Sequence, residues 1–149
     1  MSLAKRFLAA FVGSEVAHGT AVVKRTNRNG KAETDNMTVR QPLDQEKVQR
    51  HLRGELGVGS IPIKNDSTCH WGALDIDDYD LDHKSLQNDI QKLKLPLLHC
   101  RSKSGGAHLF LFLEESLDAA VLREYLTEIK IALGFSNAEI FPKQEKILA

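Results

Sequence analysis

The sequence predicts an α+β fold whose larger part is a βαββαβ unit. Two observations carry this prediction. Between residues 70 and 141, apolar runs short enough for strands alternate with two longer stretches in which apolar residues recur at helical spacing. The order of these segments is strand, helix, strand, strand, helix, strand, which is the split βαβ or RRM-like arrangement. With 149 residues, the chain is long enough to bury a core without disulfides or a structural metal.

The N-terminal part of the chain predicts a helix, a hairpin and a second helix. An amphipathic helix is expected over about residues 3–12. Two polar-rich extended runs flank Asn29-Gly30, a dipeptide favoured in type I′ hairpin turns. Asp44 is a suitable N-cap for a helix that runs to about His51. We therefore expect a compact N-terminal helix/hairpin subdomain.

The expected domains are this subdomain over residues 1–57 and an RRM-like domain over residues 58–149. A short strand is expected in "VGSIPI" at the start of the second domain. Its six main segments are, in order, "HWGALDID", "DHKSLQNDIQKLKL", "PLLHCRS", "AHLFLFL", "SLDAAVLREYLTEIKIALGF" and "AEIF". Pro96 is expected to close the first helix, Ser116 to cap the second and Gly134 to end it.

Composition and charge exclude some classes of protein. The chain is 42% hydrophobic and 27% charged, and no apolar run approaches the roughly 18 residues that span a bilayer. We expect no membrane association, and two cysteines fit a cytoplasmic protein. Net charge is zero, but residues 1–53 carry ten Lys and Arg against five acids, whereas residues 54–100 carry four against eight. Such a distribution suits a protein in which the basic region binds a polyanion and the acidic region binds metal. The alternative is that both regions are ordinary solvated surface.

In the stretch "GALDIDDYD", a strand that is expected to be buried is followed directly by a cluster of acidic residues. Residues two apart on a strand share a face, so Asp75 and Asp77 project together while the apolar residues around them face the other way. Two carboxylates on one face repel each other unless a positive group lies between them. The natural partner is Mg²⁺ or Mn²⁺, which binds through carboxylates and substrate phosphates. The remaining acids fit turn and helix-cap roles: Asp78, Asp80 and Asp82.

A second group of polar residues lies in "CRSKSGGAHLFLFL", between two apolar strands. Its glycines let backbone amides approach a phosphate, and its serines, Arg and Lys add hydroxyls and positive charge. The loop is not a Walker A motif. Alternation places His108 on one face with Phe110 and Phe112. A plain hairpin turn and a structural histidine are the competing interpretations.

Taken in order, "WGALDIDDYD", "SKSGGAHLFLF" and "LGFSNAEIFPKQ" resemble the motifs of the archaeo-eukaryotic primase (AEP) superfamily. More narrowly, they are similar to the primase-polymerase domains of TOTE conflict systems and of CRISPR-associated primase-polymerases. That superfamily carries an hDhD motif, an SxxxH-like motif and an acidic third motif on an RRM-like palm. The resemblance covers roughly residues 45–145 and implies an AEP-type palm.

The resemblance also implies roles for individual residues. Asp75 and Asp77 would ligate the catalytic Mg²⁺ or Mn²⁺, and Glu139 would stand at or near the third carboxylate position, with a surface glutamate as its alternative. Four residues would contact the phosphates of the incoming nucleotide: Ser102, Lys103, Ser104 and His108.

The implied function is a DNA primase/polymerase-like nucleotidyltransferase. It would make or extend a primer from nucleoside triphosphates on a single-stranded or primed nucleic-acid template, in replication, repair or a mobile-element or defence context. Helicase or nuclease domains are implied as partners.

Relatives continue beyond "FPKQ", so the palm is expected to be C-terminally incomplete, and activity of this chain alone is left open.

Two other functions stay open. A non-catalytic RRM-like module would bind nucleic acid without metal. A metal-dependent nuclease would use the same aspartates with water as the nucleophile, and the sequence does not separate it from a polymerase.

Overall fold

The computed structural model describes residues 1–26, 28 and 32–147, which divide into two compact units, Met1–Lys64 and Asn65–Ala149. The observed division follows residue 64, whereas the boundary expected from the sequence follows residue 57. The difference arises because the segment after residue 57 begins with a strand that pairs inside the first unit.

The first unit combines two helices with a three-stranded antiparallel sheet of order β2-β1-β3. Its elements are α1 (Leu3–Ala10), β1 (His18–Thr26), β2 (Ala32–Val39), α2 (Gln45–Leu52) and β3 (Gly57–Gly59). The expected hairpin is present as β1 and β2, while Asn29 and Gly30 lie outside the described residues. Asp44 caps α2 as expected, because its Oδ1 accepts the Lys47 N–H at 2.8 Å.

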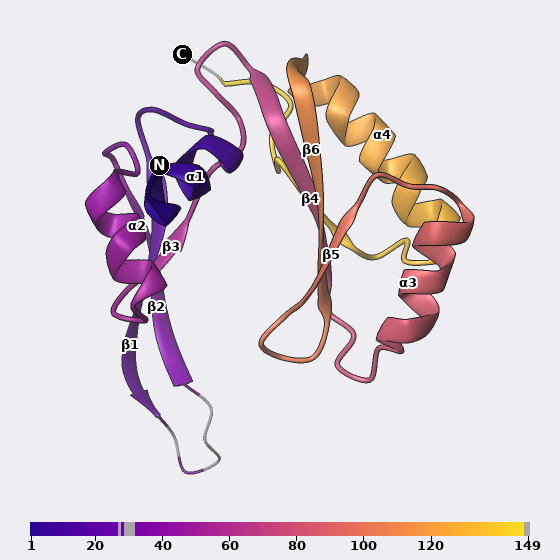
Figure 1. Cartoon of the computed structure of the whole chain (residues 1–149), viewed down its shortest axis with the longest axis horizontal. Coiled ribbons are helices and arrows are strands. Elements are labelled where there is room, and N and C mark those ends of the chain that lie inside the picture. The colour runs from indigo at the N-terminus through magenta and orange to yellow at the C-terminus, as the bar shows by residue number, and fades with distance from the viewer. Residues whose placement is uncertain (27, 29–31, 148–149) are drawn as a thin grey trace. The chain divides into compact units, whose positions relative to one another are not determined.

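The second unit has the predicted βαββαβ order and forms an α+β, AEP-like palm. Its elements are β4 (Thr68–Ile76), α3 (His83–Lys92), β5 (Leu98–Arg101), β6 (Ala107–Asp118), α4 (Ala119–Ala132) and β7 (Glu139–Phe141). The strands form one antiparallel sheet of order β5-β6-β4-β7. Figure 1 shows α3 and α4 on the same face of this sheet. The other face carries the polar residues discussed below.

Alternation along β4 and β6 separates the core from that second face. Leu74, Ile76, Leu109 and Leu111 are buried, and so are the helix residues Leu86, Ile90, Leu122, Leu126 and Ile129. Fully burying one such side chain contributes roughly 1.5–3 kcal/mol relative to exposure. The packed face therefore provides a firm support for residues on the opposite face of the same strands.

The start of α4 differs from the expectation. Ser116 does not cap the helix; it lies in β6, which continues to Asp118 because Thr68 and Cys69 of β4 pair with Asp118 and Leu117. Pairing between strands outweighs the local capping signal here. The end of the helix is as expected, since Gly134 follows it with φ +81°. Among the described residues, no helix combines the length and apolar character needed to cross a bilayer.

Candidate functional site

A row of three polar residues crosses the sheet of the second unit. Asp75 of β4 pairs with His108 of β6 on one side and with Glu139 of β7 on the other. Directly paired residues of antiparallel strands present their side chains to the same face. The Nε2 atom of His108 lies 3.3 Å from Oδ1 of Asp75. Three residues singled out from the sequence are thus brought together from three strands.

Asp77 follows this row at the end of β4. The strand ends at Ile76, one residue earlier than the sequence suggested, and Asp77 is exposed. The acids beyond it have structural roles, as expected for turn and cap residues. Asp78 Oδ1 accepts the Asp80 N–H at 3.1 Å, and Asp82 Oδ1 accepts the Ser85 N–H at 2.9 Å at the start of α3. The acid cluster therefore separates into Asp75 on the sheet, Asp77 just beyond the end of β4, and a turn.

The negative charge of Asp75 and the acids around it is only partly balanced by nearby positive groups. Burial is the largest influence on the Asp75 carboxyl and raises its pKa above the ordinary value. The neighbouring acids Asp77 and Glu139 also raise this pKa, whereas His108 and Lys143 lower it. The net direction is upward. The side chain of Asp75 is 26% exposed, so the carboxylate is partly desolvated beside two others. Such an arrangement favours an additional positive charge.

Glu139 has a cation beside it in the form of Lys143. The Lys143 ammonium forms an ion pair with the Glu139 carboxylate and lies 5.2 Å from the centroid of the Phe141 ring. Both charged side chains are well exposed, at 64% for Lys143 and 48% for Glu139. Exposed ion pairs contribute little to stability, so another ligand can displace Lys143 at low cost.

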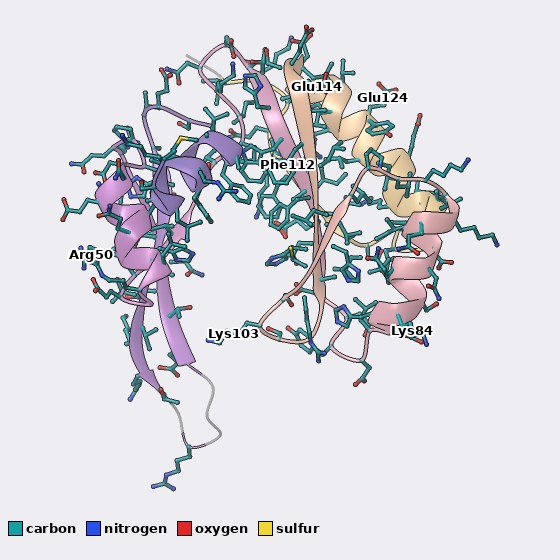
Figure 2. All side chains as sticks on the ribbon, in the orientation of Figure 1. Arg50, Lys84, Lys103, Phe112, Glu114 and Glu124 are labelled. Carbon is teal, nitrogen blue, oxygen red and sulfur yellow. The ribbon has the colours of Figure 1, made fainter. Side chains whose placement is uncertain are left out.

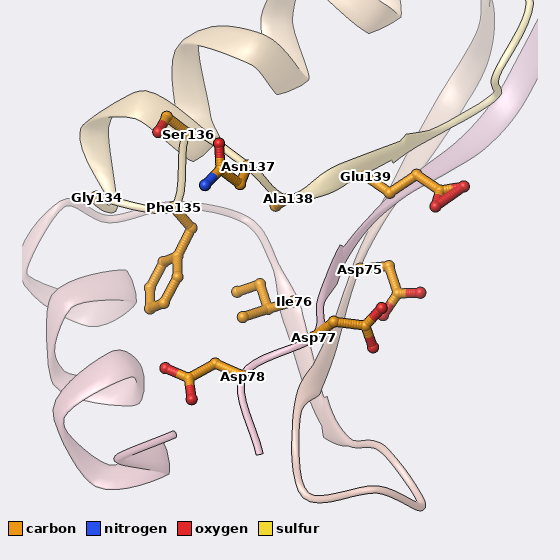
Figure 3. A pocket seen from close by; sticks show the side chains of 10 residues that line it. All are labelled: Asp75, Ile76, Asp77, Asp78, Gly134, Phe135, Ser136, Asn137, Ala138 and Glu139. Carbon is orange, nitrogen blue, oxygen red and sulfur yellow. The ribbon is translucent and has the colours of Figure 1, made fainter. Parts of the chain in front are cut away.

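A pocket of about 370 Å³ opens beside these carboxylates. Asp75, Asp77 and Glu139 lie at one side of it (Figure 3), and the other side is formed by the segment between α4 and β7. That segment contributes residues that the sequence reasoning did not select: Phe135, Ser136 and Asn137. They lie in "LGFSNAEIFPKQ", the third stretch that resembles the AEP motifs, from which only Glu139 was selected as a site residue. The volume falls in the range typical of small-molecule sites.

The Ser102–Gly106 loop joins β5 and β6 and contains the predicted phosphate contacts. The Ser102 N–H donates to Gly106 O at 2.8 Å, and the Gly105 N–H donates to Ser102 O at 3.1 Å, so the loop is a closed turn. Gly105 has φ +99°, a conformation that favours glycine. A Cβ on Gly106 would lie 2.1 Å from Ile76 O. The loop therefore rests directly on the end of β4.

Exposure on the same part of the sheet is uneven. Lys103 and Ser104 are exposed and Ser102 is half-buried; Figure 2 labels Lys103 on this loop. His108 begins the exposed face of β6, which continues through Phe110 and Phe112, as alternation predicted. The residues expected to contact phosphate thus lie along one loop and the adjoining strand, next to Asp75.

Comparison with known proteins identifies the family. A family model described as the TOTE conflict system archaeo-eukaryotic primase domain matches residues 14–147. The chain belongs to this family. The AEP resemblance seen in the motifs is therefore confirmed, over a longer range than the residues that suggested it. A search of curated proteins finds no match. At the level of the family, the AEP-TOTE domain is a primase-like nucleotidyltransferase domain.

The donor set of this AEP-TOTE domain suits a hard divalent cation. Within the described ranges, no three or more His, Cys, Asp or Glu side chains enclose a ready-made metal site. Mg²⁺ characteristically binds through one or two carboxylates, keeps several waters and takes further ligands from substrate phosphates. Asp75 and Asp77 offer that partial set, and the raised pKa of Asp75 marks a need for positive charge. The residues present are therefore compatible with such an ion.

Proposed function

We propose that this AEP-TOTE domain transfers nucleotides from nucleoside triphosphates to the 3′ end of a nucleic-acid strand along a template. The observation that carries the proposal is the row of Asp75, His108 and Glu139, formed beside the tight Ser102–Gly106 loop. Membership of the family supports the reaction class. The choice of template, nucleotide and biological context belongs to the proposal.

The acids of the site would hold Mg²⁺ or Mn²⁺. Asp75 and Asp77 are the proposed ligands, with Glu139 as the third carboxylate once it leaves Lys143. When bound, divalent ions neutralise the triphosphate and lower the pKa of an attacking hydroxyl. The partly desolvated position of Asp75 strengthens its interaction with any cation that enters. The buried apolar side chains next to it in β4 keep the strand, and so the carboxylate, in place.

The Ser102–Gly106 loop and His108 would bind the phosphates. Lys103 supplies positive charge, Ser102 and Ser104 supply hydroxyls, and His108 supplies a ring N–H beside the acids. Because the turn is already closed by its own backbone hydrogen bonds, these groups need little reorganisation when the nucleotide arrives. Preorganised donors and charges of this kind are effective where negative charge develops.

An incorporation assay tests the proposal. The protein is incubated with primed or unprimed single-stranded template, Mn²⁺ or Mg²⁺, and ribo- or deoxyribonucleotides. We expect strand synthesis that is lost in Asp75→Ala/Asp77→Ala and retained in Asp80→Ala, a change at an exposed acid of the turn. Shortening of the template would indicate a nuclease instead. Metal-independent binding without chemistry would indicate a nucleic-acid-binding module.

Stability measurements provide an independent prediction for Asp75. In metal-free protein, its raised pKa means that the folded state takes up a proton at higher pH than the unfolded chain. Stability is therefore expected to fall as the pH rises from 3.8 through the pKa of the folded state. Asp75→Asn removes this effect, so the variant should unfold at a higher temperature than wild type at neutral pH.

Thermal unfolding over about pH 4 to 7, with and without Mn²⁺, measures this effect. Mn²⁺ should raise the unfolding temperature of the wild type and leave that of Asp75→Asn nearly unchanged. Only the wild type retains the Asp75 carboxylate as a ligand for the metal. A metal-free Asp75→Asn variant that unfolds at a lower temperature than wild type at neutral pH would contradict the prediction.

A further inference from the structure

Two histidines connect helix α3 to the Ser102–Gly106 loop. His83 is the first residue of α3, and His99 lies on β5; their rings are nearly parallel, with centroids 5.2 Å apart and an interplanar angle of 14°. His83 Nε2 lies 2.7 Å from Gly105 O, and His83 Nδ1 lies 3.0 Å from His99 Nε2. The other ring nitrogen of His99 lies 3.0 Å from Oε1 of Gln87. The contacts form a continuous chain from Gln87 to the loop.

The positions of the protons in this series of contacts follow from Gly105 O, the acceptor at its end. Gly105 O can only accept, so His83 Nε2 carries a hydrogen. In a neutral ring His83 Nδ1 is then an acceptor, and His99 Nε2 donates to it. His99 Nδ1 is then an acceptor, which requires the Gln87 amide to present its N–H in place of the Oε1 that lies there. Burial, and then the neighbouring His83, lower the pKa of His99, which favours this neutral form.

The loop held by His83 also rests on the backbone after β4. A Cβ on Gly105 would lie 3.0 Å from Tyr79 O, and one on Gly106 would lie 2.1 Å from Ile76 O. The turn therefore lies in close contact with both ends of the segment 76–79. The hydrogen bond from His83 fixes the direction of the Gly105 carbonyl, and with it the peptide planes of a turn that has little other freedom.

We propose that His83 is a positioning residue for nucleotide binding. Its hydrogen bond to Gly105 O sets the orientation of the Ser102–Gly106 loop relative to the segment that carries Asp77. Lys103 and Ser104 then meet the triphosphate of a nucleotide held at the acids. His99 and Gln87 keep His83 in the tautomer that donates to the loop. This inference rests on the proposed function, because it assigns the loop to the nucleotide.

Kinetics of two His83 variants test the proposal. His83→Phe keeps a flat ring but removes the donor, and we expect the KM for the nucleotide to rise roughly three- to tenfold, with kcat changed less than about twofold. His83→Gln should restore most of the loss, because its side-chain nitrogen reaches the position of Nε2. His51→Phe is the matched control, since His51 also contacts a loop carbonyl, Leu56 O at 2.9 Å, within the first unit. That variant should leave the KM unchanged.

Two results would overturn the inference while leaving the proposed function in place. One is an unchanged KM in an active His83→Phe variant whose unfolding temperature alone has fallen, because the histidine would then only stabilise the fold. The other is a His83→Gln variant with the same KM as His83→Phe, because the lost N–H would then not be the cause.

A measurement without turnover separates the two proposals. Imidazole ¹⁵N spectra should show His83 protonated at Nε2, and amide exchange at Ser102 and Gly105 should be roughly tenfold faster in His83→Phe. Direct titration of the same variant with nucleotide and Mn²⁺ should show weaker binding. If wild type incorporates no nucleotide, the proposed function fails, and these readouts still decide the role of His83. Unchanged exchange or unchanged binding in His83→Phe overturns the inference.

Discussion

Asp75→Asn is expected to lower the rate of nucleotide incorporation by roughly a thousandfold or more, which corresponds to about 4 kcal/mol of lost transition-state stabilisation. The physical reason is that an amide has nearly the shape of the carboxylate but no charge with which to hold a divalent cation. Asp75 lies at the centre of the row between His108 and Glu139, so its charge has no substitute at the same place. Single-turnover incorporation with saturating Mn²⁺ measures the effect.

The controls for this prediction come from the same acidic stretch. Asp80→Asn changes an exposed acid of the turn and should keep the rate within about twofold of wild type. Thermal unfolding of Asp75→Asn under the assay conditions separates a loss of activity from a loss of folded protein. An Asp75→Asn protein that retains more than about a tenth of the wild-type rate would exclude Asp75 as a catalytic metal ligand.

Glu139→Gln gives the corresponding information on the third acid. A loss as large as that of Asp75→Asn would identify Glu139 as a metal ligand. A small loss would leave it as the ion-pair partner of Lys143, which is the contact that the structure shows. The role of Glu139 in chemistry therefore stays a prediction until that comparison is made.

Among glycine-to-alanine changes in the second unit, Gly106→Ala is expected to be the most damaging. The new Cβ would lie 2.1 Å from Ile76 O and 3.2 Å from the carbon of the same carbonyl. Those atoms belong to the backbone of the central strand β4, which cannot move aside as a flexible side chain can. Forcing atoms into a packed site costs roughly 1–3 kcal/mol or more, and we expect a loss at or above the top of that range.

Chemical denaturation measures this loss, and Gly59→Ala is its control. A Cβ on Gly59 would have its nearest neighbour, the Cα of Gly19, at 3.7 Å, which is an ordinary contact. If Gly106→Ala lowers the free energy of unfolding by less than about 0.5 kcal/mol, the close approach of the loop to β4 is wrong. Incorporation should fall in Gly106→Ala even where the protein is folded, because the loop would be displaced from Ile76.

The strands and helices of the second unit could be predicted because their signals are local. Alternating burial along "AHLFLFL" and helical spacing after Asp82 depend on residues close together in the chain. The errors arose where a distant partner decides the outcome. Ser116 reads as a helix cap, but β4 supplies ladder partners that keep it in a strand. The strand expected in "VGSIPI" is observed as Gly57–Gly59, and its partner is β1.

The site shows the same division between local and distant information. Alternation placed Asp75 on the face opposite to Leu74 on its strand and His108 on the face opposite to Leu109 on its own, but it could not give the register that pairs them. That register also brings Glu139 opposite Asp75. Phe135, Ser136 and Asn137 were missed because residues in a connecting segment have no periodicity to report their direction. The contact between His83 and His99 was missed because it joins a helix to a strand.

The position of β7 in the sheet makes Glu139 different in kind from the other acids. β7 has three residues and lies at the edge of the sheet, where β4 is its only partner among the residues that the structure describes. Short edge strands open at lower free energy than central ones. Opening β7 would withdraw Glu139 from the row and leave Asp75 paired with His108. The number of carboxylates facing the site therefore depends on how firmly this one short strand is docked.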